Sequence, residues 1–130
     1  MATFRIAVLG GDGIGPEVTE EAIRVADAAG KLDGAAFEWT RFPWSCDHYL
    51  KHGRVMPEDA FDQLKKFDAI LLGAIGQPGV PDHFTIGALL LPIRRKFDLY
   101  VNLRPAYLFD GVQSPLRDKA PGSIDMLVYR

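Results

Sequence analysis

The sequence predicts an α/β fold with a mostly parallel β-sheet. Short apolar runs typical of buried strands alternate with segments whose apolar residues recur at helical spacing. Glycine-rich turns follow two of these apolar runs, as they do at strand-to-helix connections. With 130 residues, of which 48% are hydrophobic, the chain is long enough to bury a core.

The first half predicts a strand, a turn, a helix and a second strand. Residues 4–9 form an apolar run, and Gly10 to Pro16 form the turn. Apolar residues then recur at helical spacing from Val18 until Gly30. Pro16 suits the first helical turn, where a missing N–H costs nothing. Residues 37–42 predict the second strand.

The middle of the chain predicts two short helices and a buried strand. Residues 46–50 are expected to form a helix that stops at Gly53, and Pro57 is expected to open another. Residues 69–72 predict a buried strand that ends in a glycine-containing turn. The apolar face of the second helix consists of Ala60, Phe61, Leu64 and Phe67.

The last third predicts a helix over residues 86–96, which Pro92 must kink or shift at its start. Residues 99–104 alternate as a strand, so Tyr100, Asn102 and Arg104 share one face. Residues 106–122 are rich in turns, and residues 124–128 predict a final strand.

Composition excludes several classes of function. The net charge is −2 without a basic stripe, which argues against nucleic acid as a partner. No apolar run approaches the ~20 residues of a membrane span, and the first ten residues lack a signal-peptide pattern. We therefore expect a cytoplasmic protein without a membrane partner. Cys46 is the only cysteine, so an internal disulfide and a cysteine-rich zinc site are excluded.

Arginines stand among apolar residues in the stretch 89–105. A guanidinium near a core is costly without a partner, so Arg94, Arg104 and the nearby amide of Asn102 suggest a small carboxylate ligand. Two simpler interpretations stay open at this point. Arg94 could pair on the surface with Asp98, four positions later, and Arg104 could reach water from the end of its strand. Arg95 is expected to be a solvated neighbour.

The glycine turn after the first strand does not match either common phosphate-binding motif. Pro16 occupies the third glycine position of G-x-G-x-x-G, and no Gly-Lys-Ser/Thr follows. Such a turn can bring backbone close to a nucleotide. A tight turn without any ligand remains the alternative.

Other polar residues favour structural roles. His48 and His52 lie four positions apart, but no acidic motif completes a zinc site. Asp12 is expected to be a turn and cap residue, and Cys46 a small core residue. Tyr100 and Tyr129 are expected to pack.

Four segments resemble the β-decarboxylating dehydrogenases, the family of isopropylmalate, isocitrate and tartrate/D-malate dehydrogenases. They occur in the family's order along the chain: residues 6–18, 72–78, 89–105 and 124–130. Residues 44–53 and 89–95 resemble the tartrate/D-malate branch. The 3-isopropylmalate branch is the alternative, and it is disfavoured because Ile86 and Gly87 stand where those enzymes carry an acidic residue.

The resemblance implies an isopropylmalate dehydrogenase-like, non-Rossmann α/β fold, of which this chain is the N-terminal portion. Residues 1–99 would belong to the first, dinucleotide-side domain, and residues 100–130 would start the second, substrate and dimer domain. The implied reaction oxidises a 2-hydroxy acid by hydride transfer to NAD and then releases CO₂, with Mg²⁺ or Mn²⁺ as cofactor. The complete protein is expected to be a homodimer.

The resemblance also implies roles for particular residues. Arg94, Arg104 and Arg130 would bind the substrate carboxylates, Asn102 would support them, and Leu90 would line the pocket. The catalytic residues and metal ligands are expected outside this chain, so we expect the 130 residues alone to be inactive. A truncated, non-catalytic module that binds a carboxylate or docks onto a partner is the other alternative. The residues implied in dinucleotide binding are Ile14, Gly73, Ala74, Ile75, Gly76, Gln77 and Pro78.

Overall fold

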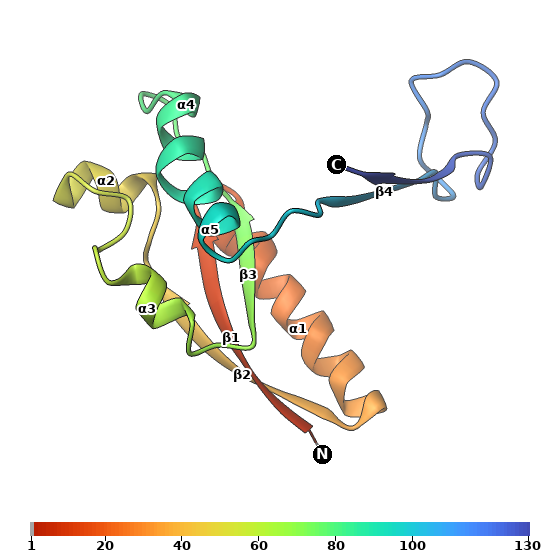
Figure 1. The fold of residues 1–130 in the computed structure, drawn as a ribbon. Coiled ribbons are helices and arrows are strands. Elements are labelled where there is room, and N and C mark those ends of the chain that lie inside the picture. Colours follow the sequence, from red (N-terminus) through yellow and green to blue (C-terminus); the bar gives the residue numbers. More distant parts are fainter. Residues whose placement is uncertain (1) are drawn as a thin grey trace. The chain divides into compact units, whose positions relative to one another are not determined.

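The computed structural model describes residues 2–130. The chain divides into two compact units, Met1–Lys96 and Phe97–Arg130, and each contains its own sheet (Figure 1).

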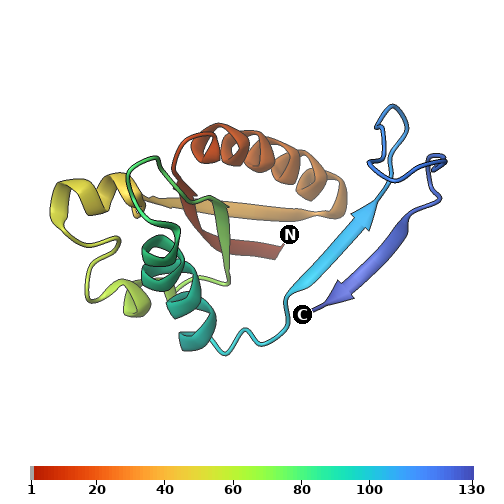
Figure 2. The same ribbon diagram turned by 90° about the horizontal axis from the view of Figure 1, so that it is seen from above.

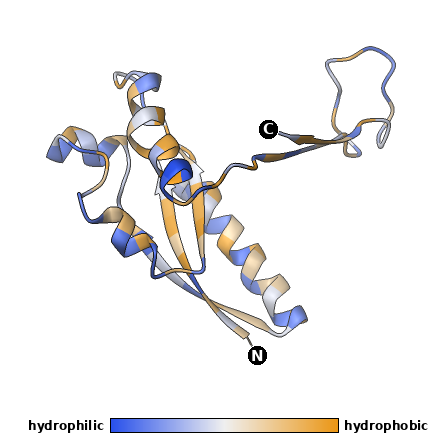
Figure 3. Cartoon of the chain, viewed as in Figure 1, coloured by the Kyte–Doolittle hydropathy of each residue, from blue (hydrophilic) through white to orange (hydrophobic). Residues whose placement is uncertain are grey.

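The first unit is built on a three-stranded parallel sheet with the order β2-β1-β3. The strands are β1 (Ala2–Gly11), β2 (Ala35–Phe42) and β3 (Ala69–Ala74). Residues 6–9 of β1 are all buried, as expected for a parallel strand with both faces covered. Helix α1 (Gly15–Asp33) covers one face, and the helical residues 82–96 lie on the other (Figure 2). Hydrophobic residues are prominent along β1 and β3 (Figure 3).

Helix α1 follows the glycine turn as predicted, with Pro16 in its first turn. It ends later than expected, because the left-handed cap is Gly34, with φ of 72° and an N–H that donates to the Gly30 carbonyl. Gly30 lies inside the helix for a packing reason. A Cβ there would meet the Phe37 ring at 2.8 Å and the Ala35 carbonyl oxygen at 2.9 Å.

Two short helices follow β2. Helix α2 (Cys46–His52) begins where the Ser45 side chain accepts the His48 N–H at 3.3 Å, and it ends at Gly53 with φ of 71°. Helix α3 (Ala60–Leu64) is shorter than predicted, because Pro57 belongs to a preceding turn in which its carbonyl accepts the Ala60 N–H at 3.2 Å.

Residues 82–96 form one helical run of three segments: α4 (Asp82–Thr85), the π-helical η1 (Ile86–Leu90) and α5 (Leu91–Lys96). The run begins four residues before the predicted start at residue 86. In the π turn, the Leu91 N–H donates to the Ile86 carbonyl, five residues back. The wide turn ends immediately before Pro92, which has no N–H to give to the helical ladder.

The second unit contains an antiparallel pair, β4 (Leu103–Tyr107) and β5 (Asp125–Tyr129). The prediction of a strand over residues 99–104 was wrong in its bounds. Asn102 and Arg130 exchange backbone hydrogen bonds of 2.8 and 3.0 Å next to the Leu103–Tyr129 pair. Among residues 2–130, no helix has the length and apolar character needed to cross a membrane.

Candidate functional site

Two loops meet at the carboxyl end of the parallel sheet in the first unit. Gly11 of β1 pairs with Ala74 of β3, and the Asp12 N–H donates to the Ala74 carbonyl at 2.7 Å. The loop after β1 and the loop after β3 are therefore held side by side. This edge is where open α/β sheets bind their ligands.

The Asp12 side chain joins three segments of the first unit. Its carboxylate accepts the backbone N–H groups of Cys46 at 3.1 Å, Asp47 at 3.2 Å and Gly76 at 3.3 Å. The side chain is buried, with only 4% of the residue exposed. Asp12 lies in the turn before α1 as predicted, since its carbonyl accepts the Gly15 N–H at 2.8 Å. Its side chain does not cap α1, whose N-cap is Ile14, but accepts N–H groups at the start of α2 instead. Within residues 2–130, no group of three or more His, Cys, Asp or Glu side chains could hold a metal ion.

The carboxylate of Asp12 and the thiol of Cys46 affect each other's ionisation. Burial raises the pKa of Asp12, but hydrogen bonds from the Cys46 thiol and from three backbone N–H groups outweigh burial and lower the pKa below 3.8. Burial and the neighbouring carboxylate raise the pKa of Cys46 from 9.0 to about 11. At neutral pH the pair is therefore a carboxylate that accepts a hydrogen bond from a neutral thiol.

Cys46 is expected to resist alkylation. Because its pKa is raised by about 2, from 9.0 to about 11, the thiolate fraction near neutral pH is about 100-fold smaller than in an unfolded chain. Reaction with iodoacetamide, followed by mass spectrometry, should be at least about 100-fold slower in the folded chain than in the chain unfolded in urea. Equal rates in both conditions would contradict the buried thiol.

The Asp12 carboxylate should also make stability depend on acid pH. Its folded-state pKa is lower than its unfolded value, so its contribution is present above the unfolded pKa and is lost as pH falls through the folded pKa. The difference in unfolding free energy between the wild type and Asp12→Asn should shrink as pH falls below about 4. Urea titrations across that range measure it, and a constant difference would contradict the assignment.

A cavity of about 120 Å³ lies beside the loop after β3. Its lining includes residues for which the family resemblance implies different ligands: Gly73 and Ile75 for the dinucleotide, and Leu90 for the substrate. Thr85 also lines the cavity and is 2% exposed. Sequence reasoning missed Thr85, because a lone threonine near a helix start carries no motif. The complete lining is Leu72, Gly73, Ile75, Thr85, Ile86 and Leu90.

The other residues predicted for the dinucleotide occupy the two loops. Ile14 is 63% exposed at the start of α1, where its side chain is available to a ligand. Gly76 has a φ of 143°, which favours glycine, and its N–H is held by Asp12. Gln77 is half-buried, while Ala74 and Pro78 are exposed.

Arg94 and Arg95 differ in their surroundings although they are adjacent in α5. Arg94 is half-buried and lies one turn after Leu90, whereas Arg95 is exposed. Helix α5 ends at Lys96, and Asp98 has a φ of 53°. Asp98 therefore lies beyond the helix that carries Arg94.

The second unit gathers three of the predicted substrate residues. Asn102 lies directly opposite Arg130 in the antiparallel ladder, so their side chains project from the same face. Arg104, two residues after Asn102, shares this face, and its Nε donates to the Asn102 Oδ1 at 3.4 Å. The predicted strand phase is confirmed for these residues. Two guanidinium groups and an amide on one face can bind a carboxylate.

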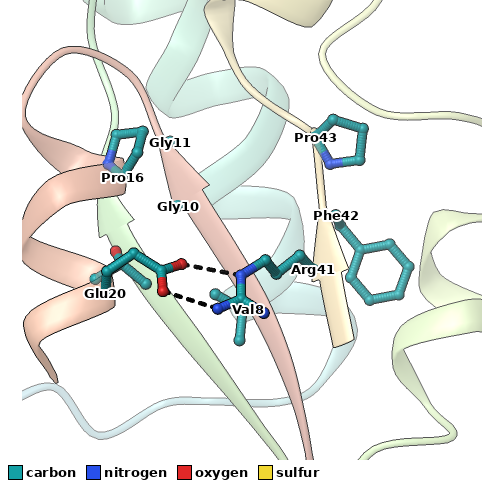
Figure 4. Close-up of a pocket in the computed structure, with 9 residues that line it drawn as sticks. Val8, Gly10, Gly11, Pro16, Glu20, Arg41, Phe42 and Pro43 are labelled. Atoms are coloured by element: carbon teal, nitrogen blue, oxygen red, sulfur yellow. Dashed lines mark hydrogen bonds and ion pairs between the residues drawn. The ribbon is translucent and has the colours of Figure 1, made fainter. Parts of the chain in front are cut away.

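A second cavity, of about 180 Å³, lies between α1 and the end of β2 (Figure 4). Its charged residues are Arg41 and Glu20, whose side chains form two hydrogen bonds of 2.9 and 2.8 Å. This pairing lowers the pKa of Glu20 and raises that of Arg41. Since the cation already faces a carboxylate, we assign no anion to this cavity.

Comparisons with known proteins give a consistent result. The sequence profile described as "Isocitrate/isopropylmalate dehydrogenase" matches residues 5–130. The chain is 52% identical to the D-malate dehydrogenase [decarboxylating] of Escherichia coli (strain K12), over all of this chain and 37% of that protein. It is 51% identical to the tartrate dehydrogenase/decarboxylase of Pseudomonas putida, over 98% of this chain and 36% of that protein.

The fold also resembles a solved structure. Isocitrate dehydrogenase from Methylococcus capsulatus superposes with a TM-score of 0.72 at 24% identity, covering 97% of this chain and 34% of that one. This likeness supports the predicted fold class. The chain spans little more than a third of the length of the curated relatives it matches.

Proposed function

The chain belongs to the isocitrate/isopropylmalate dehydrogenase family, and we propose that it is the N-terminal part of an NAD- and divalent-metal-dependent enzyme that oxidatively decarboxylates a small 2-hydroxy dicarboxylic acid. Tartrate and D-malate are the proposed substrates. The observation that carries this proposal is the 52% identity to a D-malate dehydrogenase over the whole chain.

The arginines would bind and orient the acid. A guanidinium presents two parallel N–H groups that match a carboxylate, which fixes the direction of the substrate as well as its charge. Arg104 and Arg130 would act from the second unit, where Asn102 supports Arg104 through the 3.4 Å contact. Arg94 would act from α5, and Leu90 would contact the variable group of the acid from the cavity.

The loops at the carboxyl end of the sheet would hold the dinucleotide. Gly73 and Ile75 border a cavity, and the exposed side chain of Ile14 stands at the start of α1. NAD would accept the hydride of the acid. The described residues do not form a metal site, so we propose that Mg²⁺ or Mn²⁺ is bound by residues outside these 130, and we assign no step to it here.

The alternatives have less support. The relatives named above are D-malate and tartrate dehydrogenases rather than isopropylmalate dehydrogenases. No observation favours a non-catalytic module. We further propose that the complete protein is a homodimer.

A chimera tests the function. The 130 residues replace the aligned segment of the E. coli D-malate dehydrogenase, and NADH formation is followed with D-malate, tartrate, isopropylmalate and isocitrate. We expect activity with D-malate or tartrate that requires Mg²⁺ or Mn²⁺. Equal rates with all four acids would contradict the assignment to the tartrate/D-malate branch. A folded but inactive chimera would contradict the proposed function.

The 130-residue chain alone is the control for this experiment. We expect it to produce no NADH, because neither catalytic residues nor a metal site is assigned to it. Metal-dependent NADH production by this polypeptide would refute that expectation.

A further inference from the structure

We propose that Asp12 is a positioning residue of the dinucleotide site, which fixes the loop 73–78 against the start of α1 through the backbone N–H of Gly76. This inference rests on the proposed function, since it assigns Asp12 a role in NAD binding. It goes beyond that function because Asp12 itself is not a predicted ligand-binding residue.

The first step of the argument is the number of segments that Asp12 connects. Its carboxylate accepts the N–H groups of Cys46 and Asp47 at the start of α2 and of Gly76 in the loop after β3. Its own N–H donates to the Ala74 carbonyl at 2.7 Å, and its carbonyl accepts the Gly15 N–H at 2.8 Å. One residue thus ties α2, the loop after β3 and the first turn of α1 together.

The second step is that Asp12 cannot act by direct contact. It is 4% exposed, and its carboxylate faces backbone N–H groups. Two residues that are available to a ligand lie next to the backbone that Asp12 holds. Ile14 follows Asp12 by two positions, and Ile75 directly follows Ala74. Any effect of Asp12 on a dinucleotide must therefore pass through the loops that it holds.

The third step is the charge of the group. A buried carboxylate that accepts several N–H groups makes stronger hydrogen bonds than a neutral acceptor. The hydrogen bonds lower the pKa of Asp12 despite its burial, so the group is ionised at neutral pH. An amide in its place would present an NH₂ group to at least one backbone N–H and would leave that N–H without an acceptor.

The experiment uses the active chimera and the variant Asp12→Asn. Hydrogen exchange followed by mass spectrometry measures peptides that contain Gly76, Cys46 or residues 6–9 of β1. We expect exchange in the peptides that contain Cys46 and Gly76 to become about tenfold faster, because the remaining amide oxygen is a neutral and weaker acceptor than the carboxylate, with residues 6–9 unchanged. We expect KM for NAD to rise about tenfold, with kcat and the KM for the hydroxy acid within about twofold.

The matched control is Asp27→Asn. Asp27 is a half-buried aspartate of α1, which accepts the Trp39 indole N–H at 2.9 Å. It should leave exchange at Gly76 and the KM for NAD unchanged. If Asp27→Asn raises the KM for NAD as much as Asp12→Asn does, the effect is general destabilisation and the proposal is overturned.

Cys46→Ala is the second variant, used if Asp12→Asn does not fold. It removes the hydrogen bonds of the buried thiol to Asp12 and to the Gly76 backbone, and it should shift exchange at Gly76 and the KM for NAD in the same direction by a smaller factor. Unchanged values in both assays would overturn the proposal. An unmutated chimera that folds but uses no NAD would overturn the proposed function, whereas an NAD-dependent chimera insensitive to both variants overturns this inference alone.

Discussion

Replacing Gly73 by alanine is expected to lower the free energy of unfolding of the chain by about 3 kcal/mol, because the added methyl group would clash with neighbouring atoms. A Cβ at Gly73 would overlap the Gly10 carbonyl oxygen and would meet the Thr19 Oγ1 at 2.6 Å. Gly10 lies in β1 and Thr19 is buried in α1. The clash therefore involves backbone and a fixed side chain, neither of which moves easily.

Gly87→Ala is the control for this prediction. A Cβ at Gly87 meets no atom within 4 Å, and Gly87 lies in the helical run. Alanine is the better helix former, so this variant should stabilise the chain by up to about 1 kcal/mol. Urea titrations of the two variants measure the difference, and equal effects would show that the close approach of β3 to β1 is not as described.

Replacing Arg94 by methionine in the active chimera is expected to reduce kcat/KM for the hydroxy acid by at least about 100-fold. Methionine keeps the unbranched shape of the side chain but removes the guanidinium group. Under the proposed function, the substrate carboxylate would therefore lose two charge-assisted hydrogen bonds. This loss corresponds to about 3 kcal/mol or more of transition-state binding.

Arg95→Met is the neighbouring control, since Arg95 belongs to the same helix and is exposed. Its kcat/KM should stay within about threefold of the unmutated chimera. Steady-state kinetics with D-malate and tartrate separate the two variants. If both arginines tolerate methionine equally, Arg94 does not bind the substrate.

Periodicity predicted most of the first unit, because its elements depend on local signals. The apolar run of β1, the proline in the first turn of α1 and the glycine after α2 each act within a few residues. The bounds of β4 could not be predicted in this way. They depend on which residues lie opposite in β5, and this pairing joins residues 18 to 26 positions apart in sequence.

In the candidate site too, contacts between residues close in sequence could be predicted, and contacts between distant segments could not. The common face of Asn102 and Arg104 follows from strand alternation, and the structure brings these two residues into contact. The pairing of Asn102 with Arg130 depends on the register of two distant strands. The role of Asp12 was predicted only as a local cap. Its bond to Gly76 spans 64 positions, and no spacing rule reports such a contact.

The π turn before Pro92 gives the last helix a rotational phase that a continuous α-helix would not have. One additional residue per wide turn rotates everything that follows by about 100° about the helix axis. Arg94 points where it does because five residues, rather than four, separate Ile86 from its hydrogen-bonded partner Leu91. Loss of a single residue from 86–90 would turn the wide turn into an ordinary α-helical turn and leave Arg94 and Arg95 pointing in nearly the same directions. Regularising the turn at unchanged length would instead rotate both arginines by about 100°. This segment is therefore the place in the helix where one residue can be lost without turning the arginines.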